Sequence, residues 1–119
     1  MASHVVRVAP LKTAVVSAFV NATTGTTAVV TAPAGAYVRV LSLAIVSTIA
    51  STVKFQSSTG ATDITATLPL GANGGIVLPF NEHGWFSTLT AGDVLNFVQG
   101  TATAIGIQIQ YQLMLNIPG

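Results

Sequence analysis

The sequence predicts an all-β protein, an antiparallel β-sandwich or jelly roll of about eight strands. The 119-residue chain is dominated by Val, Ile, Thr, Ala and Gly, which are typical of strands and turns. No window combines an apolar stripe of 3.6-residue period with a polar opposite face, so helices are not expected. Turn signals recur every ~8–12 residues, the spacing of a sandwich or small barrel.

Turn-forming residues end the first three expected strands. These are His4–Val8 before Pro10, Ala14–Val20 before Asn21, and Thr27–Thr31 before Pro33-Ala34-Gly35. The length suits one domain, and residues 27–119 are expected to form its sandwich. Residues 1–26 are expected to be either an N-terminal arm that adds a strand to a neighbour or the first strand pair of the same sandwich.

The long strand expected at Ala36–Ser47 is largely apolar on both faces. Strict alternation puts Tyr37, Leu41, Leu43 and Ile45 on one face and Val38, Val40, Ala44 and Val46 on the other. A strand buried on both faces needs a second layer, which a second sheet or a subunit contact would supply.

Four shorter strands are expected next. They are Thr52–Ser57 before Ser58-Thr59-Gly60, Ile64–Leu68 before Pro69, Gly75–Leu78 before Pro79, and Trp85–Ser87. The glycines of Asn73-Gly74-Gly75 are expected to supply positive φ angles in a tight connection. Trp85 and Phe86 are neighbours in a strand, so one ring is expected in the core and the other on the surface as an interface anchor.

The last two expected strands are Val94–Val98, which follows the Ala91-Gly92-Asp93 turn, and Ala104–Leu115. The final strand alternates most clearly. One face, expected in the core, carries Ile105, Ile107, Ile109, Tyr111 and Leu113; the other carries Gly106, Gln108, Gln110 and Gln112.

Charge is scarce in this chain. Only 6% of residues are charged, four of them basic and three acidic, and the net charge is +1. A typical soluble domain devotes about a quarter of its residues to charge, which keeps small proteins dispersed. We therefore expect partners to cover much of the surface. The few scattered cations do not favour a direct nucleic-acid partner.

The sequence has no cysteine, so it offers neither a disulfide nor a thiolate metal site. The first residues lack a basic segment followed by an apolar core, so no signal peptide is expected. The most apolar stretch, Val38 to Ala50, is too short and too interrupted for a membrane-spanning helix. No membrane partner is expected.

Few residues could carry out chemistry. Glu82 and His83 are adjacent on a turn and are expected to be solvated rather than to form an acid–base pair. Asp63, Glu82 and Asp93 are far apart in sequence, and neither zinc nor calcium spacing is present. We expect no catalytic residue, cofactor, metal or small-molecule substrate, and no enzyme activity.

Five turn and strand motifs follow one another between Leu68 and Phe97. They are Leu68-Pro69-Leu70, Asn73-Gly74-Gly75, Leu78-Pro79-Phe80-Asn81, Gly84-Trp85-Phe86 and Ala91-Gly92-Asp93-Val94-Leu95. This order resembles the small capsid decoration, or cement, proteins of tailed bacteriophages, over residues 36–112. The Ala-Gly-Asp turn and the long final strand are also similar to trimeric jelly rolls of the tumour-necrosis-factor-like kind.

The resemblance implies a homotrimer on the outer surface of the capsid in the virion, made in the host cytoplasm. It would clamp neighbouring subunits of the major capsid protein, with Phe97 and Tyr111 at the subunit contact. Arg7 and Lys12 complete the predicted partner-binding residues.

Two alternatives remain open from the sequence. The chain could be another phage structural component, such as a tail, a fibre or a receptor-binding tip. It could also be a carbohydrate-binding jelly roll, with a site drawn from Asn81, Glu82, Trp85 and Phe86.

Overall fold

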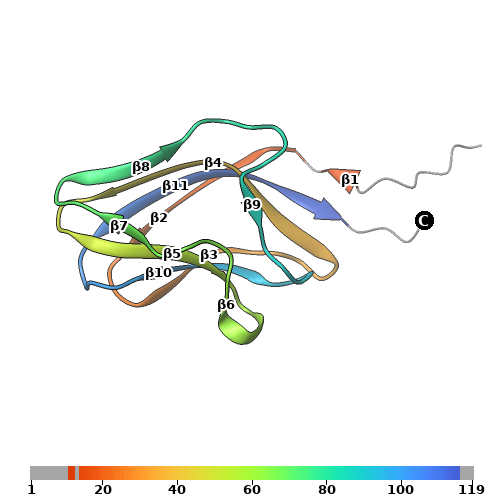
Figure 1. The fold of residues 1–119 in the computed structure, drawn as a ribbon. Coiled ribbons are helices and arrows are strands. Elements are labelled where there is room, and N and C mark those ends of the chain that lie inside the picture. Colours follow the sequence, from red (N-terminus) through yellow and green to blue (C-terminus); the bar gives the residue numbers. More distant parts are fainter. Residues whose placement is uncertain (1–10, 13, 116–119) are drawn as a thin grey trace, which may run out of the picture.

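The computed structural model describes residues 11–12 and 14–115. They form two antiparallel sheets packed face to face (Figure 1). Within these residues the one helical element is a 3-10 turn, η1 (Thr59–Ala61). The all-β class and the sandwich predicted from the sequence are confirmed.

Sheet A has six strands. They are β1 (Leu11–Lys12), β2 (Val16–Ala22), β4 (Ala36–Ser47), β8 (Gly74–Leu78), β9 (Phe86–Ser87) and β11 (Ile105–Leu115). The long strands β4 and β11 pair at the centre. β1 and β2 pair with the other side of β11, and β8 and β9 pair with the other side of β4.

Sheet B has five strands. They are β3 (Thr26–Thr31), β5 (Ser51–Ser57), β6 (Thr62–Asp63), β7 (Leu68–Leu70) and β10 (Val94–Gln99). β10 pairs with β3 on one side and with β5 on the other, and both β6 and β7 pair with β5.

The strand order is that of a jelly roll. Without the two-residue strands, sheet A runs β2-β11-β4-β8 and sheet B runs β3-β10-β5-β7. Strands distant in sequence are therefore neighbours, the first with the last, as in two nested Greek keys. The trimer stays a prediction, because the structure contains one chain.

The core lies between the inner faces of the two sheets. Phe55 of β5 contacts Phe97 of β10 and Phe86 of β9, with ring centroids 5.4 and 5.1 Å apart. Val38 and Ile45 of β4 are fully buried in the same core. Burying each such side chain contributes about 1.5–3 kcal/mol relative to leaving it exposed.

The alternation predicted for the last strand is confirmed. Ile105, Ile107 and Ile109 are at most 2% exposed, and Tyr111 and Leu113 pack against the same core. The other face of β11 points away from sheet B and carries the glutamines.

The two-faced pattern predicted for β4 is wrong, because a bulge shifts it. Gln110 pairs with Ser42 but Tyr111 pairs with Val40, so Leu41 is an extra residue without a partner in β11. On the inner face, Val38 and Val40 precede the bulge, and Leu43 and Ile45 follow it. The outer face carries Tyr37, Arg39, Ser42, Ala44 and Val46.

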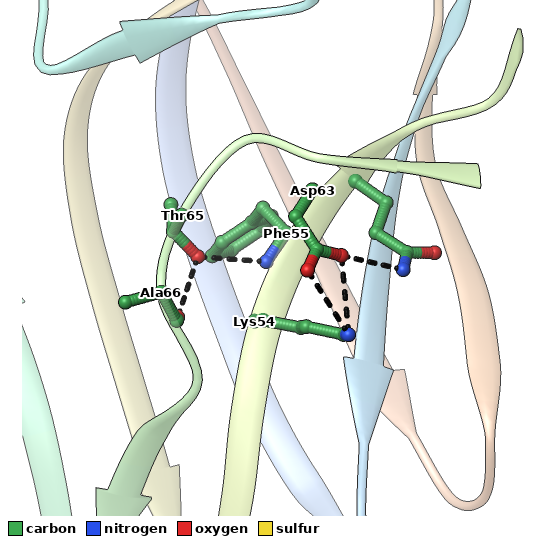
Figure 2. Close-up of polar contacts among 6 residues, drawn as sticks. Lys54, Phe55, Asp63, Thr65 and Ala66 are labelled. Carbon is green, nitrogen blue, oxygen red and sulfur yellow. Dashed lines mark hydrogen bonds and ion pairs between the residues drawn. The ribbon is translucent and has the colours of Figure 1, made fainter. Parts of the chain in front are cut away.

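The strand expected at Ile64–Leu68 is also wrong. Thr65 Oγ1 accepts a 3.0 Å hydrogen bond from the Phe55 amide and donates to the Ala66 carbonyl, as Figure 2 shows. A side chain thus takes the place of a ladder carbonyl, and pairing with β5 resumes only at Leu68. Pro69, expected to end a strand, lies exposed within β7, where an edge position tolerates it.

The two glycines that begin β8 act by close approach. The positive φ of that turn, +58°, belongs to Asn73, whereas Gly74 and Gly75 are strand residues. A Cβ at Gly75 would overlap the backbone carbonyl oxygen of Ile45 in the neighbouring strand. The expectation of positive φ at these glycines is therefore wrong, since contact between backbones is what excludes a side chain.

Residues 16–22 form a strand of this sandwich, because β2 pairs with β11 of the same chain along its length. The expected strand His4–Val8 lies outside the described residues, so for that part of residues 1–26 both alternatives, an arm and a first strand pair, stay predictions. No helix among the described residues is long and apolar enough to cross a membrane.

Candidate partner-binding surface

The outer face of sheet A exposes large apolar side chains that no part of the described chain covers. Phe19, Val77 and Val46 are 78%, 73% and 60% exposed. Strand register places them in two rows, Phe19–Gln108–Ala44–Val77 and Asn21–Gly106–Val46–Gly75. Side chains this apolar and this exposed, gathered on one face, are typical of an interaction surface.

Two shallow hollows lie on this face, and both are lined by Ala44 and Gln108. One, of about 300 Å³, is bounded by Phe19 and Val46. The other, of about 270 Å³, is bounded by Val77 and Ser42. Because small residues, Ala44 and Gly106, separate large ones, the face presents depressions that a partner's side chains could fill.

The polar groups that line the two hollows are uncharged. Ser42 Oγ donates a 3.0 Å hydrogen bond to Gln110 Oε1 across the β4–β11 pair, and Gln108 is exposed beside it. Such a surface binds by shape, apolar burial and neutral hydrogen bonds, with little contribution from ion pairs.

A larger cleft, of about 420 Å³, lies at the other end of sheet A around Arg39. We call it the Arg39 cleft; it is lined by Tyr37, Arg39, Ser87, Thr88, Leu89, Met114 and Leu115. Leu89 is 53% exposed, whereas Met114 is buried. Arg39 has no ion-pair partner among the described residues.

The loop of residues 79–85, which we call the Glu82 loop, lies beside this cleft. The Asn81 amide donates to the Leu41 carbonyl and the Trp85 amide donates to the Val40 carbonyl, at 2.9 and 2.8 Å. Gly84, at φ +80°, packs so closely that a Cβ there would lie 2.5 Å from Cγ of Arg39. The backbone of β4 therefore holds the loop in one position.

Glu82 and His83 lie at the exposed tip of this loop, as the sequence predicts. Their side chains are 78% and 84% exposed and 3.7 Å apart. Both groups are solvated, and no other titratable side chain contacts them among the described residues.

Trp85 and Phe86 point to opposite faces, which confirms the sequence prediction and decides which ring is outside. Phe86 contacts Phe55 in the core. Trp85 is 43% exposed, and its Nε1 donates a 2.8 Å hydrogen bond to the Pro79 carbonyl. Trp85 is thus a fixed aromatic group on the surface.

The outer face of sheet B is more polar and carries the ion pair Lys54–Asp63, 3.1 Å apart (Figure 2). Gln56 donates a 2.8 Å hydrogen bond to the same carboxylate. This hydrogen bond and the neighbouring Lys54 hold the pKa of Asp63 below its ordinary value. The charges here satisfy each other and do not require a partner.

Asp93 is 6% exposed and has a structural environment. It accepts hydrogen bonds from Ser57 Oγ, Thr59 Oγ1 and the Thr59 amide, at 2.6, 2.6 and 3.0 Å. The hydrogen bonds of Ser57 and Thr59 lower the pKa of the Asp93 carboxyl despite its burial. All of these donors belong to the protein, so the Asp93 carboxylate has its hydrogen-bond partners within the chain.

Of the four predicted partner-binding residues, the structure describes the side chains of Phe97 and Tyr111. Phe97 is fully buried in the core, where it offers no surface to a partner in this fold. Tyr111 is half-buried against the same core, away from the outer face of sheet A. Arg7 lies outside the described residues, and Lys12 lies in β1, its side chain also outside the description.

Sequence reasoning missed Phe19, Val77 and Arg39. For Phe19 a signal was present in the sequence. In a strand, Phe19 shares one face with the polar residues Ser17 and Asn21, so a large apolar side chain is expected there on an exposed face. Arg39 is likewise a lone cation in an apolar strand. Within residues 11–12 and 14–115 no three His, Cys, Asp or Glu residues gather as metal ligands.

Comparison with known proteins adds two solved structures with a similar fold. One is a chain of the capsid asymmetric unit of cyanophage Pam1, with a TM-score of 0.51 and 13% identity, covering 97% of this chain and 92% of that one. The other is a chain of Bacillus endospore appendages, described as disulfide-linked pili, with a TM-score of 0.54 and 11% identity, covering 98% and 96%. No family model and no curated protein matches the sequence. At these identities the likeness is one of fold alone.

Proposed function

We propose that the chain is a structural protein of a phage virion that decorates the capsid as a homotrimer and clamps neighbouring capsid subunits. The observation that carries the proposal is the part of the sheet A outer face where Phe19, Val46 and Val77 are exposed and the polar groups beside them are neutral. Such a face fits a permanently assembled partner better than a soluble monomer.

The comparisons support the same direction. One chain of similar fold belongs to a phage capsid asymmetric unit, and the other belongs to Bacillus endospore appendages. In both, a chain of similar fold is part of an assembly. The second is described as disulfide-linked, and this sequence has no cysteine, which favours the likeness to the capsid chain as a guide.

In this proposal the protein acts by binding the assembled shell in preference to free capsid subunits. Binding that favours one state stabilises it by mass action. A trimer that engages several sites at once gains avidity without a strong individual contact. We propose no enzyme activity, cofactor, nucleic acid or membrane for this role, and a location on the outer capsid surface.

Antibody labelling of purified virions tests the proposal. Label distributed over the whole head supports a decoration protein. Label confined to the tail favours the alternative of a tail, fibre or receptor-binding component, and virions free of the chain overturn a virion role altogether.

A further inference from the structure

Among the charged side chains that the structure describes, which exclude that of Lys12, one cation and two anions have no partner in an ion pair with Lys, Arg, Asp or Glu. Lys54 pairs with Asp63, and hydroxyl and amide donors surround Asp93. This leaves Arg39, which has no ion-pair partner in the described part of the chain, and Glu82, whose carboxylate lies 3.7 Å from the exposed His83 imidazole. Because the chain has so few charges, two groups of opposite charge without such a partner are candidates for an ion pair with another molecule.

The backbone of the Glu82 loop and the aliphatic stem of Arg39 lie against each other and are held in place. The Gly84 backbone packs against the aliphatic stem of Arg39, with a Cβ position 2.7 Å from its Cδ. The His83 amide donates to Asn81 Oδ1, and the Gly84 amide donates to the Asn81 carbonyl, each at 2.9 Å. A preorganised loop and a preorganised arginine lose little entropy when they bind.

The surroundings of both groups are those of an interface. The Glu82 loop carries Phe80 and Trp85, which are 54% and 43% exposed, and the Arg39 cleft is bordered by exposed Leu89. Exposed aromatic side chains beside an arginine are typical of the residues that dominate binding energy. The loop presents a carboxylate, and the cleft presents the complementary cation.

We propose that the Arg39 cleft receives the Glu82 loop of a second copy of the chain, with an ion pair between Arg39 and Glu82 across the contact. The inference rests on the homo-oligomer of the proposed function and names the residues that form it. In a ring of three, each copy gives its Glu82 loop to the next; in a two-fold dimer, the two copies exchange loops.

Charge reversal tests this contact by sedimentation velocity over a range of protein concentrations. Arg39→Glu and Glu82→Arg each place like charges together and are expected to weaken association about tenfold or more, and the double variant is expected to recover it. The matched control is Lys54→Glu with Asp63→Lys, a pair on sheet B whose reversal is expected to leave association unchanged. Arg39→Met keeps the stem against Gly84 and serves if Arg39→Glu does not fold.

Mixing the two single variants distinguishes a two-fold dimer from a ring of three. A two-fold dimer of Arg39→Glu with Glu82→Arg satisfies both contacts, whereas a ring of three must keep at least one like-charged contact. The proposal is overturned if folded single variants associate like the wild type, or if the double variant does not recover.

Capsid binding, measured separately, distinguishes the two proposals. If the wild type binds capsids, and the charge reversals at Arg39 and Glu82 leave self-association unchanged, only the Arg39–Glu82 contact is overturned. If the wild type is monomeric at all concentrations tested and does not bind capsids, the proposed function is overturned as well.

Discussion

Ser57 Oγ donates a 2.6 Å hydrogen bond to Oδ2 of Asp93, and this bond joins the end of β5 to the turn that starts β10. Ser57 Oγ also accepts a hydrogen bond from the Leu89 amide, at 3.1 Å. Two segments distant in sequence, residues 57–59 and 89–93, thus meet at one hydroxyl and one carboxylate. A buried carboxylate of this kind stabilises the fold only while it is ionised.

Asp93→Asn is expected to lower the free energy of unfolding at pH 7 by about 1–3 kcal/mol, because an amide cannot accept all three hydrogen bonds. The folded pKa of Asp93 lies below its ordinary value of 3.8. Its contribution is therefore complete above the unfolded pKa and is lost as the pH falls through the folded pKa. Urea unfolding between pH 2 and pH 7 should show the wild type and the variant converging at low pH.

Asp63→Asn is the matched control for this experiment. Its carboxylate also has a lowered pKa but is solvent-exposed. A small and similar effect for both variants at pH 7 would show that the Asp93 network does not stabilise the fold.

Gly75→Ala is expected to destabilise the fold by about 1–3 kcal/mol, since its Cβ must displace the Ile45 backbone in a rigid sheet. Gly71→Ala is the control, because no atom lies within 4 Å of the Cβ position there. Thermal unfolding of both variants measures the difference. Equal melting temperatures would contradict the close approach of β8 to β4.

Phe97 is expected to act in folding and not in association. Phe97→Ala should cost about 3–5 kcal/mol of stability, and Phe19→Ala about 0.5 kcal/mol or less. The milder Phe97→Leu variant should remain folded and bind partners like the wild type. A folded Phe97→Leu variant that loses association, measured by sedimentation, would restore Phe97 to the interface.

Val77→Asp is expected to abolish capsid binding while the chain remains folded, because it places a charge in a neutral apolar face. Ala28→Asp is the control, since Ala28 is exposed in β3 on sheet B. Cosedimentation with capsids that lack the chain measures both. Equal binding by the two variants would exclude the outer face of sheet A from the contact.

The sequence pattern predicts those parts of the fold that depend on local alternation and turns. The bounds of β4 and the buried face of β11 follow from period-two patterns between turn residues. The bulge at Leu41 does not, because it depends on the register that β11 imposes from 68 or more residues away. A one-residue shift of that kind exchanges the faces of every residue beyond it.

The sequence predicts that a partner-binding surface exists, but not which residues form it. Scarce charge indicates a covered surface, and Trp85 on an exposed turn indicates an anchor. The placement of Phe97 in the core and of Phe19 and Val77 on one outer face depends on which strands pair, and those pairings join distant segments. Asp93 likewise finds its partners 34–36 residues away.

A cryo-electron microscopy map of the virion head tests the central claim most directly. The account predicts a jelly roll on the outside of the shell at junctions between capsomers, with Phe19, Val46 and Val77 covered by protein. A head without this density, or a bound chain whose sheet A outer face points into solvent, would contradict it.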